Sequence, residues 1–282
     1  MMKMTKNVLI LSIVGFCMIA CSSNETEIEL SKSKIAAPTV NGKRLVKIKH
    51  GEAYTSIEYN TQGQVSKVKH HSKDGTTRED TYWYEDRRVI WSPLERIYNL
   101  GNGLAVECNY TALISYEDEN DMAVECRDTY AYDSGGHLIK VTRPDFSEGE
   151  PINEIYTNNA WSDDGNIRSV IETVSSEVGA LFEYEINEIK YSSIENNIPL
   201  FFTYYNKDNI YLEWQGCFGK RCKNLPQSVI YTYRTIEPSW EGYSITYNYD
   251  YTSENGLITK ISVVSTTDKG TSSKEVYELE WW

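Results

Sequence analysis

One phrase recurs along the chain and constrains its fold more than any other feature. In its clearest form, residues 130–141 read YAYDSGGHLIKV: two aromatic residues one position apart, a polar turn containing Gly, and then apolar residues around a basic one. Aromatic and β-branched residues at alternate positions suit a half-buried strand, and Asp, Ser and Gly suit a tight turn. Each copy therefore predicts a strand, a turn and a second strand.

Further copies lie at residues 57–68, 82–91, 159–170 and 249–261, and a weaker copy at 189–201 has Asn197 in place of the Gly. Successive hairpins pair with their neighbours in sequence. The predicted fold is therefore all-β, an antiparallel meander of repeated hairpins that curls into a barrel or a strongly curved sheet.

The N-terminus predicts export and a lipid anchor. Lys3 and Lys6 precede an apolar run, residues 8–20, that is short for a membrane span. Residues 18–21, Met-Ile-Ala-Cys, resemble the bacterial lipoprotein box, which implies a signal peptide over residues 1–20 and acylation of Cys21, as with palmitate. The alternative is an ordinary signal peptide that leaves a free cysteine nearby.

Residues 21–42 are polar and without periodicity, which predicts a flexible tether, and residues 43–282 form the predicted single β domain. Ser22 and the acidic residues Glu25, Glu27 and Glu29 resemble the signals that send lipoproteins of Bacteroidota-type bacteria to the outer membrane and its outer face. Alternatively, the tether is acidic only because it is solvated.

Charge bears on the kind of partner. Removal of the signal leaves 26 basic and 41 acidic residues, a net charge near −15. Nucleic acids and anionic lipids repel such a chain, so nucleic acid is not an expected partner.

Four cysteines remain in an oxidising envelope, where pairing is the usual outcome. If Cys108 faces Cys126 in a hairpin, Tyr110 faces Val124 and Glu107 faces Arg127, so apolar and charged residues both match. The nearby Cys217 and Cys222 are predicted to form a second disulfide. A four-cysteine metal site needs two close pairs, and only one exists.

No sequence motif indicates catalysis or a cofactor, since hydrolase, metalloprotease and nucleotide-binding patterns do not occur. The chain is therefore predicted not to be an enzyme, although its acidic residues leave a carboxylate-based hydrolase open. The acidic stretch at residues 117–121 suits a hairpin tip better than a calcium site. His70 and His71 are adjacent, so they point to opposite faces of a strand.

The supply of aromatic residues, 22 Tyr, 7 Trp and 6 Phe, favours binding, because flat rings with polar edges stack on sugars and peptides. Rows of Tyr at alternate positions are first of all core or cross-strand residues. The tryptophans beside turns or loops are the ones to test: Trp83, Trp161, Trp214 and Trp240.

The lipobox, the acidic tether, the repeated phrase, KNLPQSV at residues 223–229 and the final VYELEWW together resemble a family of Bacteroidota outer-membrane lipoproteins of unknown function, with a porin-like β fold and YD-like hairpin repeats. The resemblance implies a meander curled toward a barrel and supplies no activity. Arg87 and Arg88 depart from it, since they replace a turn Gly.

The predicted function is a surface-tethered binding module for a glycan or other extracellular polymer. The alternatives are a structural or assembly role in the envelope, with a protein as ligand, and the carboxylate-based hydrolase.

Overall fold

The computed structural model describes residues 35–93, 95–114, 122–145, 153–176, 179–199, 209–235 and 242–282. The predicted signal peptide, Cys21 and most of the tether lie outside these residues. No helix in the described ranges is long and apolar enough to cross a membrane.

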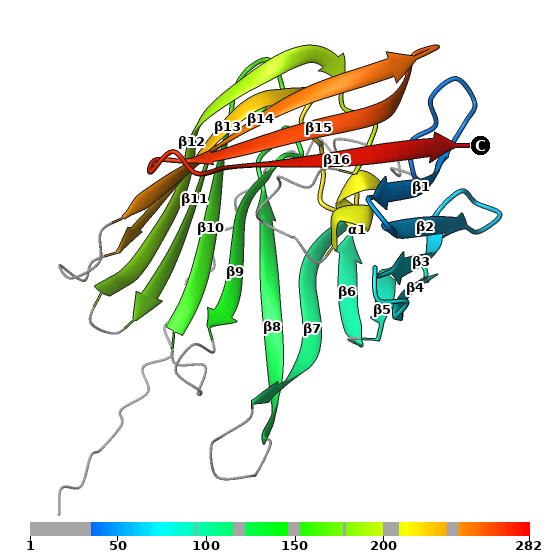
Figure 1. Cartoon of the computed structure of the whole chain (residues 1–282). Helices are drawn as coiled ribbons and strands as arrows, with labels where there is room; N and C mark the ends of the chain where they lie inside the picture. The colour runs from blue at the N-terminus through cyan, green and yellow to red at the C-terminus, as the bar shows by residue number, and fades with distance from the viewer. Residues whose placement is uncertain are drawn as a thin grey trace, which may run out of the picture. The chain divides into compact units, whose positions relative to one another are not determined.

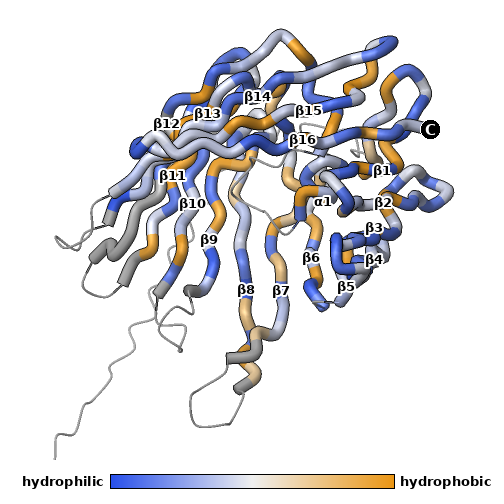
Figure 2. Tube along the Cα trace, in the orientation of Figure 1, coloured by the Kyte–Doolittle hydropathy of each residue, from blue (hydrophilic) through white to orange (hydrophobic). Residues whose placement is uncertain are grey.

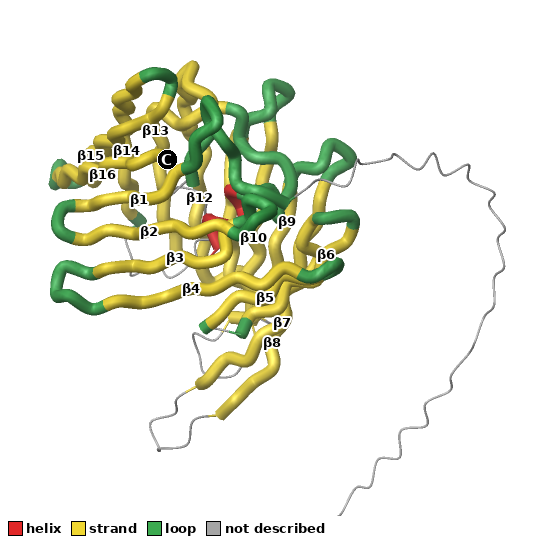
Figure 3. Tube along the Cα trace, turned by 90° about the vertical axis from the view of Figure 1, so that its right-hand side faces the viewer, coloured by secondary structure: helices red, strands yellow, loops and turns green. Residues whose placement is uncertain are grey.

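Sixteen antiparallel strands form a closed barrel in which each strand pairs with its neighbours in sequence and β1 pairs with β16 (Figures 1 and 3). The predicted all-β meander of hairpins is therefore confirmed. The first eight strands are β1 (Leu45–His50), β2 (Ala53–Tyr59), β3 (Val65–His71), β4 (Thr77–Tyr84), β5 (Arg88–Ser92), β6 (Arg96–Gly101), β7 (Leu104–Ile114) and β8 (Met122–Tyr132). The others are β9 (Leu138–Asp145), β10 (Asn153–Trp161), β11 (Ile167–Ser176), β12 (Gly179–Glu195), β13 (Asn224–Thr235), β14 (Tyr243–Glu254), β15 (Leu257–Thr267) and β16 (Ser272–Trp281).

The turns of five copies of the repeated phrase lie at one end of the barrel, because each of these copies joins an even-numbered strand to the next odd-numbered one. In four copies the turn Gly has the left-handed backbone that the sequence predicts, with φ between 77° and 84°: Gly63, Gly136, Gly165 and Gly256. The copy with Arg87 and Arg88 turns differently, since Glu85 N–H bonds to the Arg88 carbonyl and no residue from 85 to 88 has positive φ.

The weak copy at residues 189–201 does not form the predicted hairpin. β12 ends at Glu195, and the chain then enters the end of the barrel where the phrase turns lie. We call the described residues 196–199 and 209–223 the plug; it includes the only described helix, α1 (Ile210–Trp214). Figures 1 and 3 both place α1 within the ring of strands. The plugged end is therefore closed by a segment that the repeat pattern does not predict.

Backbone hydrogen bonds fasten the plug to the turns around it. The amide of Ala105 donates to the Cys217 carbonyl over 2.8 Å, and the amide of Lys220 donates to the Gly136 carbonyl over 2.8 Å. The buried plug side chains Leu212, Trp214 and Phe218 join the residues of the strands in one hydrophobic core. The plug thus replaces the lining of an open channel with packed core at this end.

The outer face of several strands is charged. Lys67 pairs with Glu79 over 2.7 Å, and Lys69 pairs with Glu58 over 3.0 Å, across β2, β3 and β4. Polar and apolar residues alternate along the strands (Figure 2). A lipid-facing barrel wall requires a continuous apolar outer band, and these strands do not carry one.

The predicted register of the Cys108 hairpin is wrong by two residues. Cys108 pairs with Asp128, and Cys126 pairs with Tyr110. The two cysteines are therefore diagonal neighbours on the inner face. Diagonal positions lie farther apart than directly opposed ones, which disfavours a disulfide. Arg127 nevertheless forms an ion pair with Glu107, diagonally and not face to face.

All four cysteines in the described part of the chain are free and buried, so neither predicted disulfide is present in the structure. Cys217 and Cys222 both belong to the plug but bond to different strands. The Cys217 carbonyl accepts from Ala105 on β7, whereas the Cys222 thiol lies 3.6 Å from the Tyr191 hydroxyl on β12.

The described residues just before β1 contact the plugged end, although the sequence assigns them to the tether. Ala37 is buried and its amide bonds to the Gly63 carbonyl over 3.1 Å. At the other terminus, Arg44 and Trp282 exchange two backbone hydrogen bonds. The chain therefore enters and leaves the barrel at the plugged end.

Candidate functional site

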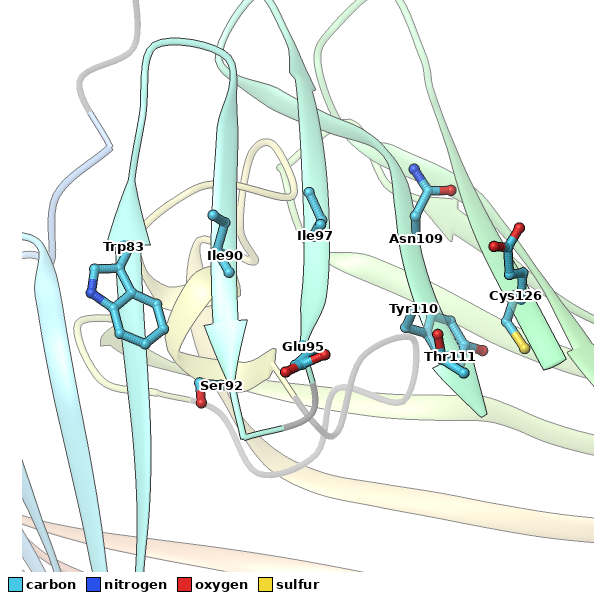
Figure 4. Close-up of a pocket in the computed structure, with 10 residues that line it drawn as sticks. Trp83, Ile90, Ser92, Glu95, Ile97, Asn109, Tyr110, Thr111 and Cys126 are labelled. Carbon is cyan, nitrogen blue, oxygen red and sulfur yellow. The ribbon is translucent and has the colours of Figure 1, made fainter. Parts of the chain in front are cut away.

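Trp83 begins a straight row of side chains on the outer face of the barrel. Its neighbours Tyr82 and Tyr84 point inward, so strand alternation directs the Trp83 indole outward. Cross-strand pairing then aligns residues on five consecutive strands, from β4 to β8: Trp83, Ile90, Ile97, Asn109 and Arg127. Figure 4 shows the first four side by side. We call this set the Trp83 row.

Trp83 is 50% exposed, whereas tryptophan residues in folded proteins are highly buried on average. It lies between two surface hollows because it lines both. The larger, of about 620 Å³, extends over β4–β8. The smaller, of about 510 Å³, extends over β4, β3 and the β2–β3 turn at Asn60 and Gln62. The indole is therefore open to a ligand on two sides.

Polar groups surround the apolar part of the larger hollow. Ile90 and Ile97 form its floor beside Trp83, and its polar lining is Ser92, Glu95, Asn109, Thr111 and Glu125. An aromatic face with hydroxyl, amide and carboxylate groups around it is suited to a ring that has an apolar face and polar edges.

The predicted opposition of His70 and His71 is confirmed. His71 stacks on Tyr54 at the outer face, with ring centroids 4.1 Å apart. His70 points inward, where its Nε2 lies 3.1 Å from Asp80 Oδ2 and its Nδ1 lies 3.1 Å from the Thr55 hydroxyl. Sequence reasoning missed this inner cluster, because its members come from three strands whose registers were not known.

The inner cluster has the residue types of a catalytic relay, but its contacts are those of a structural link. It joins β2, β3 and β4, and Arg78 bonds to the same Asp80 oxygen as His70, over 3.1 Å. The Tyr211 ring of α1 lies 6.4 Å from His70. The cluster therefore connects the barrel wall to the plug.

Burial keeps the interior thiols protonated. Desolvation raises the pKa of Cys222 to about 11 and the pKa of Cys217 to about 12. Since the thiolate is the reactive form, these plug cysteines are poor nucleophiles near neutral pH.

The two other described tryptophans selected from the sequence, Trp161 and Trp214, do not form a surface site. Trp161 stacks on His137, with centroids 4.5 Å apart, and donates to the Leu138 carbonyl over 2.9 Å. Trp214 is buried in the plug and donates to the Asn197 carbonyl over 3.1 Å. Trp240 lies outside the described residues, as does the acidic stretch at 117–121. Among the residues that the structure describes, no three His, Cys, Asp or Glu side chains are grouped to hold a metal ion.

Comparison with solved structures relates the barrel to porin-like proteins. A porin-like protein from Bacteroides vulgatus aligns with a TM-score of 0.59 and 13% identity, covering 84% of this chain and 97% of that one. A porin-like protein from Bacteroides uniformis aligns with a TM-score of 0.56 and 14% identity, covering 88% and 100%. At such identities the likeness shows the fold alone, which agrees with the porin-like β fold that the sequence motifs imply.

No family model matches the sequence. No curated protein matches it either.

Proposed function

We propose that this protein is a lipoprotein, anchored through Cys21 in the outer membrane at the cell surface, that binds a glycan or other extracellular polymer with the Trp83 row. The observation that supports this proposal most is the half-exposed Trp83 indole, which lines two hollows on the barrel wall. Trp282 is more exposed, but it lines neither hollow.

Covering the Trp83 indole with a ligand supplies enough free energy for weak binding by each protein molecule. A Trp side chain buries on the order of 200 Å², so covering the exposed half gains roughly 2 to 3 kcal/mol at about 25 cal/mol per Å². Such a contact alone gives weak binding. Many anchored copies on one polymer raise the effective affinity without new contacts, which suits a polymer better than a small molecule.

The anchor and the barrel are close along the chain. Thirteen residues lie between Cys21 and Ile35, and this stretch of chain spans at most about 50 Å. An acylated Cys21 would therefore tether the barrel within about 50 Å of the membrane surface.

The test uses the full-length lipidated protein in detergent micelles, applied to a panel of immobilised polysaccharides and host polymers. We expect retention on at least one polymer, loss of retention in Trp83→Ala, and no loss in Trp282→Ala, the matched control with a far more exposed indole. Labelled palmitate should enter the wild type and not Cys21→Ser. No retention on any polymer, together with a protein partner recovered by crosslinking, would instead favour the structural role.

A further inference from the structure

Two carboxylates border the larger hollow without an ionic partner. Glu95, in the turn between β5 and β6, and Glu125, on β8, both line it. Neither forms an ion pair among the described residues, whereas the basic side chains nearby do: Lys67 with Glu79, Arg88 with Glu85, and Arg127 with Glu107. The charge left over at the hollow is therefore negative.

We propose that the Trp83 row selects a linear sugar polymer that carries protonated amino groups, and discriminates against polymers that carry carboxylate or sulfate. This inference rests on the proposed function and specifies its ligand. The ammonium groups would meet the carboxylates of Glu95 and Glu125, while the ring faces lie on Trp83 and on the Ile90 and Ile97 floor.

The charges of Glu95 and Glu125 favour a cationic ligand by an amount of known order. An exposed charge pair changes affinity by about two- to fivefold, and salt weakens it. A carboxylate in place of the ammonium turns the attraction to Glu95 and Glu125 into repulsion. The ratio of the two dissociation constants is therefore larger than the effect of the attraction or of the repulsion alone. An ammonium near the Trp83 face gains further from the negative face of the indole.

The Trp83 row also limits the length of sugar chain that it can contact. Neighbouring strands lie about 4.8 Å apart, so three spacings from Trp83 to Asn109 extend over roughly 14 Å. This length accommodates a short run of sugar rings laid across the strands. Affinity should therefore rise with the number of rings and then level off, instead of rising without limit.

The experiment measures dissociation constants of the full-length protein in detergent micelles for three oligosaccharides of equal length: oligoglucosamine, its N-acetylated form and oligogalacturonate. The measurements are made at mildly acidic pH, where the amino groups are protonated. We expect glucosamine to bind at least fivefold more tightly than the acetylated form, and galacturonate to bind most weakly. Added salt should reduce the preference.

Variants separate this inference from the function on which it rests. Glu95→Gln with Glu125→Gln should remove most of the preference for glucosamine and leave binding of the acetylated form within twofold. Glu254→Gln, an exposed acid at another turn, should change neither. Trp83→Ala should weaken both ligands.

Binding that depends on Trp83 but shows no preference for the amine, or a preference that survives the double variant, overturns the inference and leaves the proposed function standing. Oligolysine is measured in the same way as a cationic ligand without sugar rings. If it binds and no sugar binds, the assignment to a sugar is overturned. Binding of none of these ligands overturns the inference, and the polymer panel then decides the proposed function separately.

Discussion

The phenol of Tyr132, at the end of β8, donates a 2.7 Å hydrogen bond to the carbonyl of Ala105, at the start of β7. The same bond recurs at the plugged end in seven of the eight odd–even strand pairs. The donors and acceptors are Tyr59 and Leu45, Tyr84 and Val65, Tyr132 and Ala105, Trp161 and Leu138, Tyr191 and Ile167, Tyr251 and Pro226, and Trp281 and Ile258. In β6 the corresponding region contains Leu100, which has no side-chain donor. The second aromatic residue of the repeated phrase therefore has a structural role, which explains why it is Tyr or Trp and not Phe.

Tyr132→Phe should lower the free energy of unfolding by about 1 kcal/mol, because it removes one hydrogen bond to the carbonyl of the buried residue Ala105. Urea denaturation followed by circular dichroism measures the change. Tyr54→Phe is the control, since Tyr54 stacks on His71 at the outer face and should change stability by less than about 0.5 kcal/mol. Equal effects in the two variants would refute the structural role of the phenol.

Gly219→Ala tests the attachment of the plug. Gly219 has φ +86°, and a Cβ there would lie 2.3 Å from the Gly136 carbonyl oxygen, a backbone atom of the β8–β9 turn. Gly75 has the same φ, but its Cβ would meet nothing within 4 Å. We expect Gly75→Ala to cost about 1 kcal/mol for the left-handed backbone alone, and Gly219→Ala to cost at least twice as much.

Hydrogen exchange distinguishes a loosened plug from a general loss of stability. The amide of Lys220, which bonds to the Gly136 carbonyl, should lose protection in Gly219→Ala while amides in β14 and β15 keep theirs. Uniform loss across the barrel would show that the plug is not a separate unit.

The repeated phrase predicts the hairpins and the meander because local residue types set both the turns and the alternation. Closure of the barrel by β1 and β16, and the plug, are long-range features. The weak phrase at 189–201 illustrates the limit: Tyr191 occupies the expected position and bonds to Ile167, yet the chain then leaves the sheet. The register error at Cys108 has a similar cause, since Glu107 and Arg127 attract each other diagonally as well as face to face.

The candidate site could be predicted only in part. Alternation correctly separates Trp83 from Tyr82 and Tyr84, but the row with Ile90, Ile97 and Asn109 depends on three registers at once. Trp214 follows a stretch with no strand pattern, so the sequence alone does not show that the plug buries it.

The cysteines should be free and slow to react. Because burial raises the pKa of the Cys217 and Cys222 thiols to about 12 and about 11, iodoacetamide at pH 8 should label the native protein much more slowly than the unfolded protein. Unfolding without a reductant should expose four thiols, those of Cys108, Cys126, Cys217 and Cys222. Mass spectrometry that finds fewer labels would show that disulfides form.

Glu107 should contribute to acid sensitivity. Its pKa is lowered from the usual value by the side-chain hydrogen bond from Asn99 first, and also by Asn109 and Arg127. A carboxyl whose folded pKa lies below its unfolded pKa stabilises the fold above the unfolded pKa, and that stability is lost as pH falls through the folded value. Glu107→Gln should therefore show a smaller loss of stability between about pH 5 and pH 3 than the wild type. An unchanged acid limb in the thermal denaturation profile would contradict this assignment.

The most direct test of the central claim is the ratio of dissociation constants for a retained polymer, measured with full-length Trp83→Ala and Trp282→Ala proteins whose unfolding transitions match the wild type. Loss of about 2 kcal/mol from the indole corresponds to a factor of about thirty, so Trp83→Ala should bind more than tenfold more weakly while Trp282→Ala binds like the wild type. Equal affinities in the two variants would contradict the claim that the Trp83 row is the binding surface.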